Sequence, residues 1–222
     1  MYQKVFAFSL ALGLLTVSAL AQDEYKIEIT PYFGYTFSEG VDITAQDIGN
    51  GEAVDRISPT SAFSYGFSFD WLASENFGLG FNFSQQGSSL EGRVRPSGKR
   101  EFTDMKVRNY HGIFTYNLGD EDSEMRPFFF GGLGATQYSP SQISGNDVNG
   151  STRFSTTWGG GVKYFFSENI GFRGLGRWTP TYIKSDPGGI WCSPWWPWNC
   201  WVVGNPNYSH QFEMSAGVTI RF

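Results

Sequence analysis

Apolar and polar side chains alternate with a period of two residues along several stretches of this chain. From Tyr25 to Phe37, apolar side chains occupy every second position, and polar or small ones lie between them. The same alternation returns over residues 62–71, 77–84, 104–118, 153–166 and 211–222. Because successive side chains of a strand point to opposite faces, each stretch is predicted to be a strand with one apolar face.

Two further stretches, 126–138 and 170–184, complete a set of eight predicted strands. The register of 126–138 stays open, because Phe128, Phe129 and Phe130 are consecutive. Each strand is near or above the ~9–11 residues that cross a bilayer at a tilt.

The connections between these strands alternate in length. The short ones are residues 74–76, 118–125 and 167–169, and the long ones are 38–60, 88–100, 139–150 and 185–207. Outer-membrane barrels have short periplasmic turns and longer extracellular loops. The pattern therefore predicts both termini on the periplasmic side.

The size of the alternating side chains indicates which face points into the barrel. An eight-stranded barrel is just wide enough to be filled by side chains, so several Phe, Tyr and Trp per strand would overfill it. Aromatics make up 18% of the chain, and charged residues 17%, below the ~25% of soluble domains. We therefore expect the aromatics to face lipid, in an all-β, eight-stranded antiparallel up-and-down transmembrane β-barrel.

A secreted soluble barrel with an apolar interior would alternate in the same way. That arrangement would turn charged positions such as Glu28, Lys163 and Glu213 outward and place the large side chains inside. The membrane barrel is favoured, because only lipid tolerates so much exposed apolar surface.

Several charged residues occupy the alternate strand positions whose side chains are expected to face the lumen. A narrow lumen desolvates them, and an unpaired buried charge is costly. Two interpretations follow: an interior plugged by a polar network, which we favour, and a small pore or gated salt-bridge switch. The predicted lumen charge network comprises Glu28, Asp70, Lys163, Arg173, Arg177 and Glu213, with Lys26 and Arg221 on the same parity.

The first 21 residues have the layout of a secretory signal peptide. Lys4 precedes an apolar run over 5–15, and Ala19-Leu20-Ala21 follows with small residues around the middle position. The alternative, a membrane anchor, is disfavoured because the run is short for a spanning helix. We expect residues 1–21 to be removed and 22–222 to form one barrel domain. The net charge of −5 disfavours nucleic-acid binding.

Four segments carry a resemblance to known proteins. They are Ser-Glu-Asn-Phe-Gly-Leu-Gly at 74–80, Ser-Glu-Asn-Ile-Gly-Phe-Arg at 167–173, Arg-Pro-Phe-Phe-Phe-Gly-Gly-Leu-Gly-Ala at 126–135, and the terminal 217–222. Over essentially all of 22–222 the chain resembles the OmpA-type and OmpW-like small outer-membrane β-barrel proteins. The resemblance implies that Phe222 is the assembly signal read by the barrel-assembly machinery, and that outer-membrane lipid surrounds the protein.

The last long connection contains both cysteines of the chain, Cys192 and Cys200. In an exported protein, two cysteines usually form a disulfide, and a zinc site is disfavoured because no histidine is near. The segment is predicted to be either a rigid cap on the barrel rim or a binding loop for an extracellular ligand. It holds five of the eight tryptophans: Trp191, Trp195, Trp196, Trp198 and Trp201.

Catalytic and metal-binding patterns are weak. Ser209, His210 and Glu213 can be written as a Ser/His/Glu set, but adjacent strand residues point to opposite faces. His111 could approach Asp70 only if the strand registers allow it. The acidic turn 119–124 lacks the EF-hand spacing for Ca²⁺. We therefore predict no enzyme activity, no cofactor and no metal.

These observations favour a monomeric outer-membrane barrel with a structural or surface-interaction role and a plugged lumen. A narrow channel for small or apolar solutes is the alternative, and a lipid-modifying membrane enzyme is a more distant one.

Overall fold

The computed structural model describes residues 27–49, 51–120, 123–141, 150–183 and 207–222. In this part of the chain every element is a strand, and each paired strand runs antiparallel to its neighbours. No helix long and apolar enough to cross a membrane occurs among these residues. The strands are β1 (Ile27–Ser38), β2 (Val41–Gly49), β3 (Glu52–Pro59), β4 (Ala62–Leu72), β5 (Phe77–Arg95), β6 (Gly98–Asn117), β7 (Met125–Pro140), β8 (Ser151–Phe165), β9 (Ile170–Ile183) and β10 (Asn207–Arg221).

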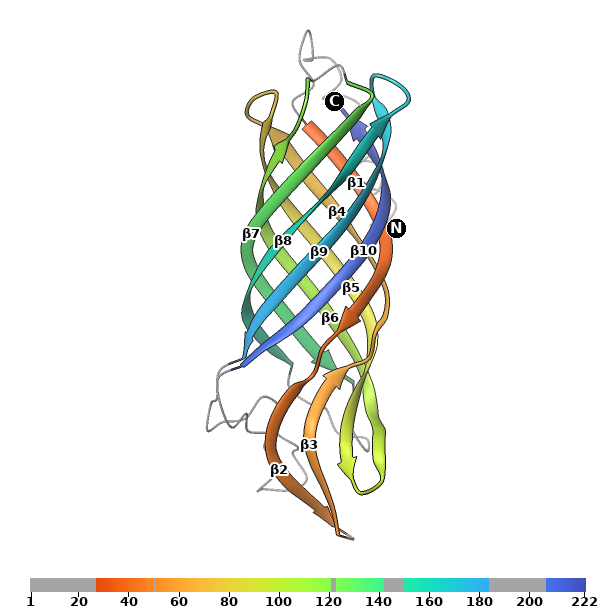
Figure 1. Cartoon of the computed structure of the whole chain (residues 1–222), viewed down its shortest axis with the longest axis vertical. Coiled ribbons are helices and arrows are strands. Elements are labelled where there is room, and N and C mark those ends of the chain that lie inside the picture. The colour runs from red at the N-terminus through yellow and green to blue at the C-terminus, as the bar shows by residue number, and fades with distance from the viewer. Residues whose placement is uncertain (1–26, 50, 121–122, 142–149, 184–206) are drawn as a thin grey trace, which may run out of the picture.

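Eight of the described strands close into a ring. The order is β1–β4–β5–β6–β7–β8–β9–β10, and β10 pairs with β1. The first and the last described residues lie side by side, because Phe222 N donates to Ile27 O at 2.9 Å. The eight-stranded antiparallel up-and-down barrel expected from the sequence is therefore confirmed (Figure 1).

The remaining two strands extend the barrel at one end. β2 and β3 form a hairpin, and β3 pairs with the far half of β5. β5 and β6 run 19 and 20 residues and pair along most of that length, so they project beyond the ring beside the hairpin (Figure 1). The extension is thus an antiparallel sheet in the order β2–β3–β5–β6.

The sequence-based assignment of 38–60 and 88–100 as loops was wrong. Most of 38–60 is strand, and 88–100 is strand on both sides of the turn at Pro96 and Ser97. In the extension, the strand positions whose side chains point inward are apolar, and these side chains pack together. This core contains Val41, Ile43, Val54, Ile57, Leu90, Val94, Met105, Val107, Tyr138 and Ile183, with Phe102 against it. We call these buried residues the mouth cluster.

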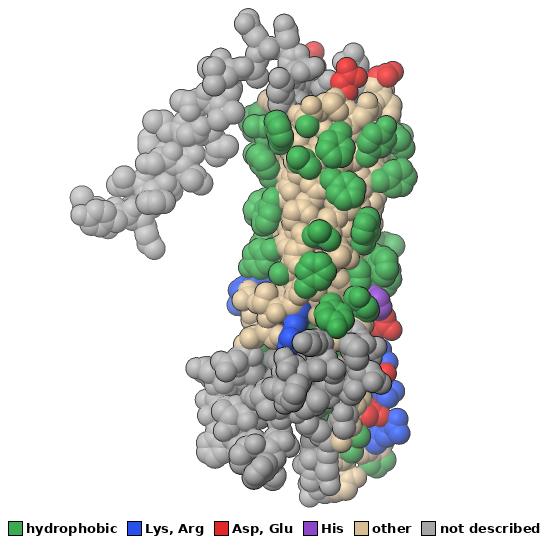
Figure 2. Space-filling model, turned by 90° about the vertical axis from the view of Figure 1, so that its left-hand side faces the viewer, with side chains coloured by type: hydrophobic (Ala, Val, Ile, Leu, Met, Phe, Trp, Pro, Cys, Tyr) green, Lys and Arg blue, Asp and Glu red, His purple; other side chains and the backbone are tan. Residues whose placement is uncertain are grey.

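The outer face of the ring is apolar. Exposed side chains include Phe33, Phe63, Phe114, Leu133 and Met214. They form a belt around the barrel, which appears green in Figure 2. The expected outward direction of most aromatics is confirmed, and such an apolar band is what a lipid bilayer requires.

The structure defines the register of 126–138, which the sequence left open. It also corrects the expectation that the aromatic side chains face lipid. Phe129 faces outward with 60% of its surface exposed, whereas Phe128 and Phe130 are buried inside the barrel. Phe130 fits because Gly159 lies opposite it on β8 and has no side chain. A Cβ at Gly159 would lie 2.7 Å from the Phe130 ring. Glycine therefore makes room in the lumen for an aromatic ring.

Candidate functional site

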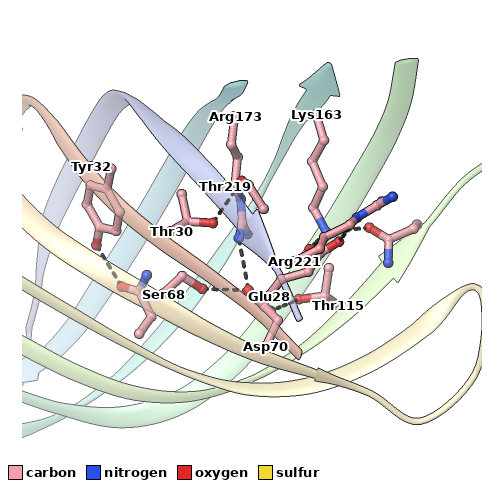
Figure 3. Close-up of polar contacts among 12 residues, drawn as sticks. Glu28, Thr30, Tyr32, Ser68, Asp70, Thr115, Lys163, Arg173, Thr219 and Arg221 are labelled. Carbon is pink, nitrogen blue, oxygen red and sulfur yellow. Dashed lines mark hydrogen bonds and ion pairs between the residues drawn. The ribbon is translucent and has the colours of Figure 1, made fainter. Parts of the chain in front are cut away.

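Glu28 is the centre of the first group of charges in the lumen. Its Oε2 lies 2.5 Å from Lys163 Nζ, and its Oε1 accepts a hydrogen bond from Arg221 Nε at 3.0 Å. Lys163 also donates to Asn117 Oδ1 at 2.9 Å. Figure 3 shows that the side chains of Glu28, Lys163 and Arg221 converge in the lumen from β1, β8 and β10.

Asp70 is the centre of a second group next to the first. Arg173 Nη1 donates to its Oδ2 at 2.9 Å, and Ser68 Oγ donates to the same oxygen at 2.7 Å. The other oxygen accepts from Thr115 Oγ1 at 2.9 Å. Both carboxylate oxygens of Asp70 are therefore satisfied (Figure 3).

Glu213 and Arg177 form the third group. Arg177 Nη2 lies 2.6 Å from Glu213 Oε2 and 2.8 Å from Ser84 Oγ, and Nη1 contacts Asn82. The Tyr32 hydroxyl donates to Asn82 Oδ1 at 3.0 Å. One guanidinium therefore links side chains of β5, β9 and β10 across the lumen.

All six residues of the predicted lumen charge network lie inside the barrel as side chains no more than 3% exposed, and each has a partner of opposite charge. Charges buried to this degree are tolerated only when they are paired and hydrogen-bonded. The network fills space in the lumen and holds its charged members in place, although Arg177 Nε and Glu213 Oε1 have no hydrogen-bond partner among the described residues.

Aromatic rings in the lumen pack against the cations. The Arg173 guanidinium lies 4.4 Å from the centre of the Phe128 ring, and Lys163 Nζ lies 5.4 Å from the same ring. Arg221 lies 3.4 Å from the Phe165 ring. Ring faces attract cations, most strongly where water is excluded. Sequence reasoning missed Phe128 and Phe165 as part of the network, although alternation from neighbouring residues could have placed Phe165 inside.

An uncharged polar layer follows in the same lumen. His111 Nε2 lies 2.9 Å from Ser155 Oγ, and Thr136 Oγ1 donates to Ser155 Oγ at 3.0 Å. Asn109 Nδ2 donates to Gln211 Oε1 at 3.2 Å. The described contacts of Asp70 do not include His111, so the suggested approach of these two residues is not seen. Asn109 and His111 could have been found from the sequence, because both occupy the inward-facing alternate positions of β6.

The Ser209, His210 and Glu213 set is separated by the barrel wall. Ser209 is buried and donates to Glu39 O at 3.1 Å, while His210 lies on the outer face against Trp178. Glu213 is inside and bound to Arg177. These three residues therefore form no nucleophile–base arrangement, as expected for neighbours on one strand.

Several sequence predictions fall outside the described residues. They are the signal segment 1–21, Lys26, the Cys192 and Cys200 pair, and the candidate loop contacts Trp191, Trp195, Trp196, Trp198 and Trp201. Phe222 is described at the end of β10, and its role as an assembly signal stays a prediction. No group of three potential metal-ligating side chains occurs among the described residues.

A family model described as "Outer membrane protein beta-barrel domain" matches residues 7–222. The chain belongs to this family. Its place is therefore the bacterial outer membrane, where short turns face the periplasm and the larger connections face outside. By that rule the mouth cluster and the β2–β3 hairpin lie at the extracellular end. A comparison with curated proteins found no match.

Solved structures share the fold. Neisserial surface protein A is 16% identical, with a TM-score of 0.56, and the match covers 88% of this chain and 97% of that protein. OprG from Pseudomonas aeruginosa is 14% identical, with a TM-score of 0.56 and coverage of 91% and 98%. AlkL, whose structure was determined in lipid bilayers, is 12% identical, with a TM-score of 0.53 and coverage of 91% and 93%. At such identities the likeness shows the fold alone.

Proposed function

We propose that this protein is a non-conducting outer-membrane barrel with a structural or surface-interaction role at its extracellular end. Two successive layers of buried side chains in the barrel support the proposal. The first is the ion-paired network around Glu28, Asp70 and Glu213, with every charge buried and partnered.

The second layer is the mouth cluster. Its residues come from β2 and β3 of the hairpin and from β5, β6, β7 and β9 of the ring, so apolar side chains of the extension and of half of the ring strands pack together at this end. A hydrophobic constriction opposes the passage of water and ions because it does not stay wet. A polar solute would have to cross both this layer and the ion-paired network.

The extension supports the surface-interaction part of the proposal. Its outer face carries paired charges: Asp55 contacts Arg93 and Arg95, each at 2.6 Å, and Lys99 lies 2.9 Å from Glu91. A sheet with an apolar inside and a charged outside is suited to stand in water beyond the membrane. The predicted Cys192–Cys200 segment follows β9 in the sequence, whose last residue, Ile183, belongs to the mouth cluster, and we extend the proposed contact with an extracellular ligand to it.

A narrow channel is the second candidate, and one observation favours it. Several buried lumen atoms have no hydrogen-bond partner among the described residues, including His111 Nδ1, Gln211 Nε2 and Arg177 Nε. Buried polar groups normally find a partner, and ordered water is the usual one where protein groups are missing. A hydrated lumen would be the starting point for a narrow polar path.

Liposome swelling separates the two candidates. Liposomes that contain the refolded protein are diluted into isotonic solutions of small sugars, with a wide porin as the positive control and protein-free liposomes as the baseline. The closed barrel should swell at the baseline rate with every sugar. Swelling that is faster for the smallest sugars would reject closure and support the narrow channel.

A further inference from the structure

The outer surface changes from apolar to polar between two neighbouring cross-strand rows on β5, β6 and β7. The last apolar row joins Phe83, Tyr110 and Ala135. The next row toward the extracellular end joins Gln85, Arg108 and Gln137. Membrane barrels change from an apolar band to polar residues at the level of the lipid headgroups, with aromatic residues along the boundary. Arg108 is therefore placed at headgroup level.

Arg108 is held in place by neutral groups. Its Nε donates to Gln85 Oε1 at 2.8 Å, and its Nη1 contacts Gln137 Oε1 at 3.4 Å. Gln85 in turn donates to the Tyr65 hydroxyl at 2.5 Å on the neighbouring strand β4. The amides orient the guanidinium on the outer wall and leave its positive charge uncompensated.

Lys106 is the next outward position on β6, and it is exposed. Its partner on β5 is Gly87, where an added Cβ would meet nothing within 4 Å. Side chains two residues apart on a strand lie on one face, about 7 Å apart at their Cα atoms, so two long cationic side chains can reach one small anion. The missing side chain at Gly87 leaves open room beside them.

Neither cation has an acidic partner within the described part of the chain. Basic residues farther out on the extension differ in this respect, since Lys99 is paired with Glu91 and Arg100 with Glu52. Figure 2 shows basic side chains just beyond the apolar belt at the end that carries the extension. Two unpaired cations at the headgroup level indicate an anionic partner from outside the chain.

We propose that Arg108 and Lys106 form a binding site for the phosphate group of a lipid headgroup in the surrounding leaflet. Phosphate oxygens accept hydrogen bonds from a guanidinium in the planar geometry that Arg108 offers, and an ammonium adds a point charge. The row of Phe83 and Tyr110 continues directly below, where it can pack against the acyl chains of the same lipid. A membrane lipid therefore matches the site better than free phosphate.

Lipid selectivity of the full-length protein tests this site. The protein is reconstituted in phosphatidylcholine vesicles with spin-labelled phosphatidic acid, whose headgroup is a phosphate monoester, or with spin-labelled phosphatidylcholine. Electron paramagnetic resonance then measures the relative association of the two lipids. The wild type should select phosphatidic acid. Lys106→Gln and Arg108→Gln should each lower the selectivity about five-fold, the effect expected of one basic residue at a membrane surface.

Lys99→Gln is the matched control, because Lys99 is an exposed cation on the same strand but is already paired with Glu91. It should leave the selectivity unchanged. Arg108→Lys keeps the charge and should retain most of it, and heat-modifiable gel mobility verifies that each variant is folded. A wild type without selectivity, or a double Lys106→Gln/Arg108→Gln variant that keeps it, would overturn the site. Displacement of the lipid by inorganic phosphate would assign the site to a soluble anion and overturn the lipid source.

Discussion

Gly159 and Phe130 face each other inside the barrel wall, and this pair shows how single residues determine what fits in the lumen. Among the described residues, Phe128 and Phe130 each lie opposite a glycine of β8. Parity along the sequence could not reveal the arrangement, because it depends on which residues of β7 and β8 are paired. Alternation along one strand does not by itself give that pairing, which also depends on the connection between the strands.

Gly159→Ala should therefore destabilise the protein by about 1–3 kcal/mol, the usual cost of overpacking a filled interior. Gly176→Ala is the matched control, because Gly176 is on the adjacent strand and a Cβ there would meet nothing within 4 Å. The free energy of unfolding in urea, measured in lipid vesicles, checks both variants. Equal stability of the two variants would contradict the packing of Phe130 against Gly159.

The Asp70–Arg173 pair allows a second prediction at the residue scale. Asp70→Asn leaves the Arg173 guanidinium buried without its counter-charge, which should cost about 3–5 kcal/mol. Glu91→Gln removes the partner of the exposed Lys99 and should cost less than about 1 kcal/mol. The same urea titration compares them. A similar decrease in the free energy of unfolding for the two variants would show that the Asp70–Arg173 pair is not desolvated as described.

The alternation of side chains along each strand predicted that all six charged residues face the lumen. It could not predict which of them form ion pairs. Glu28 on β1 binds Lys163 on β8, and β10 and β9 lie between these strands in the ring. Such contacts across a barrel depend on the stagger of strands far apart in sequence. The members of the candidate site were therefore predictable from the sequence, whereas their geometry was not.

At the scale of elements, the sequence predicted the eight ring strands but not the extension. Residues 88–100 contain Gly, Ser, Pro and several charges, which favour a loop. Their strand conformation depends on long-range packing, because Leu90 and Val94 lie against Val54 and Ile57 of the hairpin in one cluster. Tertiary packing of this kind overrides local composition.

Deleting the β2–β3 hairpin should leave the ring intact and loosen the extension. Neither hairpin strand belongs to the closed ring, so heat-modifiable mobility should persist. The inward face of β5 and β6 would lose its cover, and trypsin should cut faster at Arg93, Lys99 and Arg100. Mass spectrometry of the fragments locates the cuts. Loss of heat-modifiable mobility would contradict the independence of ring and hairpin.

Acid should weaken the extension through Asp55. Its hydrogen bond from Arg93, together with the charges of Arg93 and Arg95, lowers the pKa of the Asp55 carboxyl below its ordinary value of 3.8. A lowered pKa in the folded state adds stability above the ordinary value, and this is lost as the pH falls through the folded pKa. Amide exchange in β3, corrected for intrinsic rates, should rise below pH 3.8, and Asp55→Asn should remove that rise. An unchanged pH profile in Asp55→Asn would contradict the assignment.

At the scale of the whole molecule, an apolar belt surrounds a polar lumen, and an apolar cluster lies at the extracellular end. The belt places the protein in lipid, the network fills the space between the strands, and the extension stands outside the membrane. We therefore expect a rigid barrel without a continuous water-filled path through its lumen. Its specific contacts with other molecules are then made on its outer surfaces.

Single-channel recording in planar bilayers tests this closure most directly. The refolded full-length wild type, verified by heat-modifiable mobility, is inserted into a bilayer between symmetric salt solutions, with a wide porin as the positive control. The closed barrel predicts a flat baseline without discrete current steps. Reproducible steps of uniform size from the wild type would contradict the plugged lumen.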